Sequence, residues 1–212
     1  MTAASRRLVP SLCAASAWFA ATALSALPVF ASTVVQLGLD QLCQRADKIF
    51  RGTVLRADPG TLEAGGGRLP TVTYRISVEE SFKGDYETLK GIRVVEIRML
   101  GKPDPVTGGN RRLVPVLGDL PALKVGETYL LLTTAASTAG LSTTVGLGQG
   151  CFHVTGKAGQ EQALNGFRNV NLLPPPEAAA AARSSAGARS RSGGPIPYSE
   201  LATQIRSLLA GR

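Results

Sequence analysis

The sequence predicts a mainly β fold, in the form of a small closed barrel of about five strands with a short helix before it and a separate helix after it. Residues 71–84 show the clearest pattern, because apolar and polar side chains alternate there with the period of a strand that buries one face. Other short apolar segments, bounded by glycine and proline, are also typical of strands. Helical spacing of apolar residues occurs only in residues 39–46 and 198–212.

The predicted domain, residues 32–173, begins with the helix at residues 39–46, which has Cys43 on its apolar face. Residues 47–57 follow as a strand, in which Gly52 marks a bulge or a close approach of two backbones. Glycine and proline are frequent in residues 58–70, and this composition predicts a mobile loop.

The strand at residues 71–84 ends in Phe82-Lys83-Gly84, an apolar side chain followed by a turn. Residues 91–100 form the next predicted strand, and its alternation slips at Val94-Val95, which indicates a bulge. Residues 101–123 are rich in proline and glycine and predict a long irregular connection.

Residues 128–134 form a continuous apolar run, which predicts a central strand buried on both faces. Residues 141–154 are the last predicted strand. Their glycines leave one face bare, so that another backbone can lie close. Residues 162–173 are expected to add a hairpin arm or an edge strand.

The C-terminal part of the sequence divides into a linker and a helix. Residues 174–197 are of low complexity and too poor in apolar residues to fold alone, so we expect a disordered linker. The final helix, residues 198–212, is amphipathic and has Ser199 as its expected cap. So short a helix is marginal alone and must dock on the barrel, on a partner or on a membrane surface.

Residues 1–31 resemble a signal peptide. Arg6 and Arg7 precede a long apolar run, and small residues at the end of the run predict cleavage between Ala31 and Ser32. We therefore expect an exported protein, periplasmic or extracellular, with no membrane span in the mature chain. An uncleaved membrane anchor is the alternative, because the apolar run is nearly long enough to span a bilayer.

Cleavage would leave two cysteines, Cys43 and Cys151, and an even count in an exported chain predicts one disulfide. The bridge would close a loop of about 108 residues and stabilise the fold by about 4 to 5 kcal/mol. Two buried thiols are the alternative. These cysteines and His153, the single histidine, lack the local spacing of zinc ligands, so no metal site is expected.

The chain is basic, with 23 Lys and Arg against 15 Asp and Glu and a formal net charge of +8. Without Arg6 and Arg7 the counts are 21 and 15, a net charge of +6. This balance favours anionic surfaces, although much of the excess lies near the C-terminus. Nucleic-acid binding is not expected, because the aromatic residues fall mostly at core or turn positions and not among basic residues on one face.

No catalytic, cofactor-binding or metal-binding residues are predicted. The glycines of residues 146–150 are followed by another strand and not by the helix that a phosphate-binding loop requires. His153 has no local acid or nucleophile and is expected to face outward. Glu79 and Glu80 are adjacent in a strand, so they should point to opposite faces and cannot act as an acid/base pair.

Three segments together resemble the netrin-like domains, the group with an OB-type barrel that includes the tissue inhibitors of metalloproteinases. They are residues 46–54 (ADKIFRGTV), residues 74–84, ending in FKG, and residues 126–132 (GETYLLL), within a match over residues 39–154. The resemblance implies an OB-like barrel and a binding module. The N-terminal cysteine with which those inhibitors chelate zinc has no counterpart, since Ser32 is the predicted N-terminus.

The leading hypothesis is an exported, non-enzymatic interaction module that binds a protein or a cell-envelope polymer. A regulator or inhibitor of a secreted protease, with residues 60–70 or 101–123 as its contact edge, is the alternative. An enzyme of unrecognised type is a further alternative.

Overall fold

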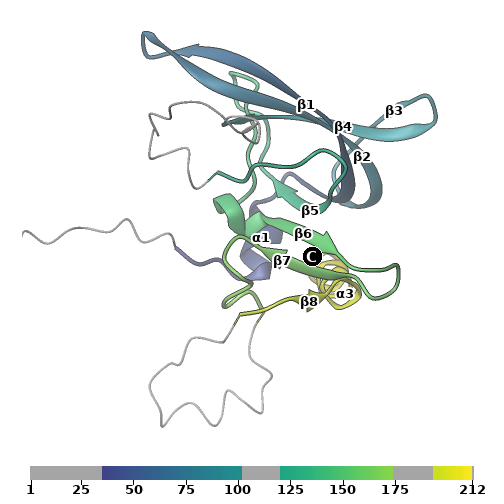
Figure 1. The fold of residues 1–212 in the computed structure, drawn as a ribbon. Coiled ribbons are helices and arrows are strands. Elements are labelled where there is room, and N and C mark those ends of the chain that lie inside the picture. Colours follow the sequence, from purple (N-terminus) through teal and green to yellow (C-terminus); the bar gives the residue numbers. More distant parts are fainter. Residues whose placement is uncertain (1–34, 102–119, 174–192, 212) are drawn as a thin grey trace, which may run out of the picture. The chain divides into compact units, whose positions relative to one another are not determined.

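The computed structural model describes residues 35–101, 120–173 and 193–211, and the strands of these segments form one antiparallel sheet (Figure 1). The order of strands in the sheet is β3-β4-β2-β1-β5-β6-β7-β8. The strands are β1 (Lys48–Ala64), β2 (Gly67–Lys83), β3 (Glu87–Leu89), β4 (Ile92–Leu100), β5 (Thr128–Thr133), β6 (Cys151–Thr155), β7 (Gln162–Asn165) and β8 (Ile196–Pro197). The helices are α1 (Leu39–Arg45), α3 (Tyr198–Ala210) and the short 3-10 helix η2 (Leu147–Gly150).

The sheet does not close, so the predicted OB-like closed barrel of about five strands is wrong, although the fold is mainly β. Closure requires the two outermost strands to pair with each other. Here the outermost strands are β3 and β8, and each pairs with a single neighbour, β4 and β7 respectively. The sequence pattern specified apolar faces of strands but did not specify which strands would meet.

Strand β5 is buried on both faces, as its continuous apolar run predicted. Leu130 and Leu132 belong to one cluster of buried side chains and Tyr129 and Leu131 to another. We call the first cluster the helix-side core. Its buried members are Leu37, Leu39, Leu42, Cys43, Ala46, Ile49, Leu130, Leu132, Val145, Phe152, Val154, Ala163, Leu172, Tyr198, Leu201, Ala202 and Ile205.

We call the second cluster the hairpin-side core, because β1 and β2, which form a long hairpin, contribute to it. Its buried members are Phe50, Val54, Val72, Tyr74, Ile76, Val78, Val95, Ile97, Met99, Leu123, Tyr129, Leu131 and Cys151. Strands β2 and β4 contribute to this core together with β5 and β6, although β1 separates the two pairs in the sheet. The sheet therefore bends around the hairpin-side core.

Residues 58–70, predicted to be a mobile loop, belong instead to a long β1–β2 hairpin. The strands pair as far as Ala64 and Gly67 and are joined by Gly65 and Gly66, whose φ angles are 59° and 75°. A two-residue turn with positive φ at both positions matches the twist of antiparallel strands. The glycines that indicated mobility thus form a tight turn.

Gly52 lies at a register shift between β1 and β2, which confirms the predicted bulge and close approach. A Cβ atom at this position would lie 2.1 Å from the carbonyl oxygen of Ser77. The irregular pairing also changes the face of the sheet on which alternate side chains of β2 lie. Val78 is in the hairpin-side core, whereas Phe82 packs against the helix-side core.

The predicted bulge at Val94-Val95 is wrong, because β4 pairs with β2 in continuous register from Val94 to Leu100. The predicted strand at residues 141–154 is also wrong over most of its length. It contains a single bridge from Thr144 to Thr133, the helix η2 and only then β6. Close backbone contact was correctly predicted, since a Cβ at Gly150 would lie 2.7 Å from the carbonyl oxygen of Val145.

The two α-helices lie near the predicted positions, and both pack in the helix-side core. Helix α1 buries Leu39, Leu42 and Cys43, as its spacing predicted. Helix α3 begins at Tyr198 after Pro197, which makes no side-chain cap, so the prediction of Ser199 as the cap is wrong. Of the predicted irregular segments, residues 102–119 and 174–192 lie outside the described residues, as do Ala31 and Ser32. The predicted disordered linker, residues 174–197, is wrong at its end, because Ile196 and Pro197 form β8 and pair with β7.

Candidate functional site

Cys43 and Cys151 are both buried, and no disulfide joins them. Cys43 packs in the helix-side core from α1, whereas Cys151 begins β6 and packs in the hairpin-side core. The sheet therefore lies between them, because successive residues of β6 point to opposite faces. The predicted disulfide is not formed, and the two buried thiols of the alternative are present. Burial raises the pKa of the Cys151 thiol to about 12.

His153 does have an acid partner, which the local sequence did not reveal. Its Nε2 atom lies 3.1 Å from Oε2 of Glu127, and the same carboxylate oxygen accepts a hydrogen bond of 2.7 Å from the Tyr129 hydroxyl. Register brings the group together, since His153 on β6 pairs with Tyr129 on β5. No serine, threonine or cysteine side chain among the described residues hydrogen-bonds to His153. Within the described residues the arrangement thus consists of a carboxylate, a tyrosine hydroxyl and an imidazole.

The pKa of Glu127 is lowered, chiefly by the hydrogen bond from Tyr129 and further by the charges of His153 and Lys124. Burial raises the pKa of Tyr129, and the adjacent Glu127 carboxylate raises it further. Tyr129 is therefore a hydrogen-bond donor at neutral pH, and its ring lies 5.1 Å from the His153 ring. These contacts fix the orientation of the His153 imidazole, which lies beside Tyr129 near the start of β5.

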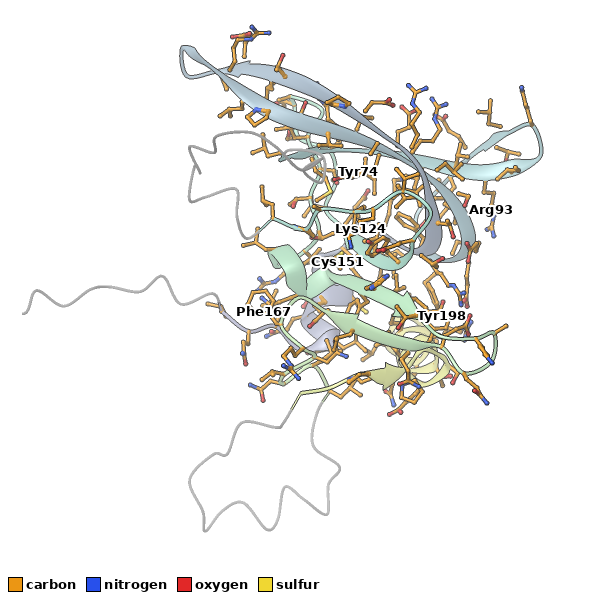
Figure 2. All side chains as sticks on the ribbon, viewed as in Figure 1. Tyr74, Arg93, Lys124, Cys151, Phe167 and Tyr198 are labelled. Atoms are coloured by element: carbon orange, nitrogen blue, oxygen red, sulfur yellow. The ribbon has the colours of Figure 1, made fainter. Side chains whose placement is uncertain are left out.

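Glu79 and Glu80 do not point to opposite faces, because the irregular pairing of β1 and β2 lies beside them. Glu79 lies 3.2 Å from Nε of Arg51, and Glu80 accepts a 2.5 Å hydrogen bond from the hydroxyl of Tyr198, a residue labelled in Figure 2. The Tyr198 ring in turn lies 4.6 Å from the Arg51 guanidinium. Both carboxylates therefore take part in one network with Arg51 and α3.

This network fastens α3 to the sheet. Glu80 also pairs with Arg206, which lies over the ring of Phe82 at 5.2 Å. Burial would lower the pKa of Arg51, but its hydrogen bond to Glu161, at 2.8 Å, and the charge of that carboxylate outweigh burial and raise it. The carboxylates are committed to structural partners, which leaves the network no free acid or base.

A groove of about 510 Å³ lies beside the β3–β4 hairpin and is the strongest candidate for a binding surface. It is lined by Lys48, Arg75, Asp85, Tyr86, Glu87, Thr88, Leu89, Val94, Val95 and Glu96. Its volume falls within the usual range for ligand sites. Arg75 comes from the polar face of the strand with the clearest sequence pattern. We call this feature the hairpin groove.

Both cationic side chains that line the hairpin groove, Lys48 and Arg75, have partners within the protein. The Arg75 guanidinium lies 2.5 Å from the Glu96 carboxylate. Lys48 donates a 2.8 Å hydrogen bond to the carbonyl oxygen of Asp85 and lies 5.6 Å from the ring of Tyr86. Burial raises the pKa of Tyr86, which donates a hydrogen bond to the carbonyl oxygen of Lys83 at 2.7 Å.

The acidic and apolar groups of the same hairpin have fewer partners. The side chains of Asp85 and Glu87 make no ion pair within the described parts of the chain. Leu89 and Ile92, which face each other across the hairpin, are 50% and 56% exposed. The lining of the hairpin groove thus has three carboxylates against two cations, next to exposed apolar surface.

Sequence reasoning missed β3 altogether. The strand has only three residues, and its signal is the Lys90-Gly91 pair that follows it. Both residues have positive φ, 52° and 81°, and they form the two-residue turn to β4. A strand of three exposed residues has no apolar alternation from which it could be detected.

No group of three or more His, Cys, Asp or Glu side chains in residues 35–101, 120–173 and 193–211 is placed to hold a metal ion. None of the helices in these segments has the length and apolar character needed to cross a membrane. No protein-family model matches the chain, and a search of the curated proteins gives no match. The resemblance to netrin-like domains therefore stays a prediction from the sequence.

Proposed function

We propose that the chain is an exported, non-enzymatic interaction module that binds a protein partner at the hairpin groove. One observation carries the proposal: the exposed pair Leu89 and Ile92 lies at an open edge of the sheet, next to the groove. Export rests on the signal peptide predicted for residues 1–31.

Exposed apolar side chains at a sheet edge favour association, and proteins usually protect such edges. All three residues of β3 are exposed, and the side chain of its last residue, Leu89, is apolar. A partner that covers Leu89 and Ile92 would bury apolar surface and gain about 25 cal/mol for each Å² removed from water. The polar lining of the groove would give the contact its specificity.

The non-enzymatic part of the proposal is supported by the contacts of the titratable groups. Glu127 orients His153, but no hydroxyl or thiol nucleophile is bonded to that imidazole within the described residues. A hydrolytic activity of the purified protein that is lost on changing His153→Ala would contradict this part.

Site-specific photo-crosslinking in the producing cells tests the contact surface. Leu89 is replaced by p-benzoylphenylalanine. The matched control is the same replacement at Leu55 on the β1–β2 hairpin, because Leu55 is 49% exposed and Leu89 is 50% exposed. We expect a discrete, protease-sensitive adduct from position 89 that disappears when Ile92→Asp is added. Position 55 should give no such adduct.

Two results would overturn the proposed contact surface, and a third would overturn the choice of a protein as the partner. One is the absence of any adduct at position 89 in cells that accumulate the protein. The other is an identical adduct from positions 89 and 55, which would indicate contact without a defined surface. An adduct resistant to protease would identify a cell-envelope polymer as the partner and would overturn the choice of a protein.

A further inference from the structure

We propose that the partner binds as an extended strand that pairs with the outer edge of β3, and that this strand carries a basic and an apolar residue two positions apart. The inference rests on the proposed function, because it specifies how the hairpin groove is occupied. Three features of the hairpin support it: the backbone groups at its edge, the order of its side chains and its charge.

Thr88 presents the backbone groups that an added strand would need. Lys90 and Gly91 form a two-residue turn, so the flanking residues Leu89 and Ile92 are a hydrogen-bonded pair. Hydrogen-bonded and non-hydrogen-bonded pairs alternate along an antiparallel ladder, so Thr88 and Arg93 are the next, non-hydrogen-bonded pair. The N–H and C=O groups of Thr88 therefore point away from β4, at the edge of the sheet.

The side chains of β3 define which residues the added strand should carry. Glu87 and Leu89 lie two positions apart and thus on the same face, and both line the hairpin groove. Residues directly opposite each other in neighbouring strands contact most closely. A partner strand would place a Lys or Arg opposite Glu87 and an apolar side chain, two positions away, opposite Leu89.

The charge of the hairpin groove favours a basic occupant. Lys48 and Arg75 are held by Tyr86 and Glu96, whereas Asp85 and Glu87 have no ion pair in the part of the chain that the structure describes. The groove lining therefore holds one more carboxylate than cation, on a chain with a formal net charge of +8. A basic peptide would be attracted to this edge in spite of the overall charge of the protein.

A second copy of the chain is a poorer occupant. Antiparallel pairing of two β3 strands through Thr88 would place Glu87 of each copy opposite Leu89 of the other, so that neither Glu87 would have a cation directly opposite it. Sedimentation of the protein at concentrations up to those of the binding assay checks this point. A dimer abolished by Thr88→Pro would show that a second copy occupies the edge and would overturn the inference.

Fluorescence anisotropy with three synthetic peptides tests the inference on the purified protein. The first is a seven-residue peptide with Lys at positions 2 and 6, Val at position 4 and Thr at the odd positions, so that Lys and Val are two positions apart on one face in either strand direction. The second has Glu in place of Lys, and the third is the Lys peptide with alternate backbone nitrogens methylated. We expect saturable binding of the first, and affinity at least about tenfold lower for the other two, a difference of about 1.4 kcal/mol. Higher salt should weaken the binding of the Lys peptide.

Variants of the protein assign the binding to β3. Thr88→Pro removes the outward N–H without removing a hydrogen bond to β4 and should lower the affinity about tenfold. Thr88→Val keeps the N–H and should bind as the original protein does. Glu87→Lys should reverse the preference, so that the Glu peptide binds better than the Lys peptide.

The outcomes separate the inference from the proposed function. Equal binding of the Lys and methylated peptides, or of the Lys and Glu peptides, would overturn the inference, whatever the effect of Thr88→Pro on the hairpin. If the crosslink at position 89 is nevertheless found, the proposed function stands and only its strand-pairing form is wrong. If both experiments fail, the hairpin groove is not a binding surface.

Discussion

The two cores that share β5 are built in different ways. The helix-side core is covered by α1 and α3, which come from the beginning and the end of the described chain. The hairpin-side core is covered by the sheet itself, because side chains of β2 and β4 meet those of β5 and β6. One face of the sheet is thus covered by two helices, of which α3 makes an ion pair with β2, and the other face is covered because the sheet bends.

The difference shows how one strand can serve two cores. Val78 lies in the hairpin-side core and Phe82 against the helix-side core, and the register of β2 with β1 is irregular between them. Only an irregularity of this kind moves alternate residues of a strand from one face to the other. It also brings Glu79 and Glu80 into the network that holds α3.

From this comparison we predict that substitutions at adjacent residues of β5 destabilise different cores. Leu131→Ala and Leu132→Ala should each lower the free energy of unfolding by about 2 to 5 kcal/mol, because both side chains are fully buried. Combined with Leu201→Ala in α3, Leu132→Ala should show a coupling energy of at least about 0.5 kcal/mol, whereas Leu131→Ala should be additive. Urea unfolding of the double-mutant cycles measures both quantities. Equal coupling in the two cycles would mean that the cores are not separate.

Gly52 lies at a register shift where the backbones of β1 and β2 approach closely, and we predict that it tolerates no side chain. Gly52→Ala should cost about 2 to 4 kcal/mol, since the added Cβ would lie 2.1 Å from a backbone oxygen of β2. Gly67→Ala at the tip of the same hairpin is the control. Its Cβ would approach no atom closer than 3.9 Å, and it should change stability by less than about 0.5 kcal/mol. Similar urea midpoints for the two variants would show that the approach at Gly52 does not constrain the hairpin.

The contacts that hold α3 to the sheet predict a smaller loss of stability on substitution of Tyr198. Tyr198→Phe removes the hydrogen bond to Glu80 and should cost about 1 kcal/mol, while the ring remains in the core. Faster amide exchange along α3 than in β5 would accompany this loss. Thr203→Ala, on the exposed side of the same helix, should leave the exchange rates unchanged. If both variants behave alike, apolar packing alone holds the helix.

The smallest expected effect is at Glu127, on the hairpin side. Its pKa is lower in the folded chain, so its stabilising contribution is present above the ordinary value of 4.5 and is lost as the pH falls through the folded pKa. Glu127→Gln should therefore be less stable at pH 7, by less than about 1 kcal/mol, and this difference should shrink towards pH 3. Thermal unfolding across this range measures it. A difference that grows as the pH falls would have the wrong sign for this explanation.

Some of the fold and little of the candidate site could be predicted from the sequence. Alternation identified β2 and its core residues, the apolar run identified β5, and helical spacing identified the buried face of α1. The candidate site was missed because β3 is short and exposed on both faces. The acid partner of His153 was missed because Glu127 is distant in sequence and reaches it only through the pairing of β5 with β6.

The sequence by itself determined the buried face of α1, the buried face of β2 as far as Val78 and the two-sided burial of β5, because that information is local and periodic. Only the tertiary structure decided which elements cover those sides. Cys43 and Cys151 are both on apolar faces, yet the sheet separates them into two cores. The open edge at β3 was likewise decided by the tertiary structure. An apolar pattern favours burial of a face, but it does not specify which other element covers that face.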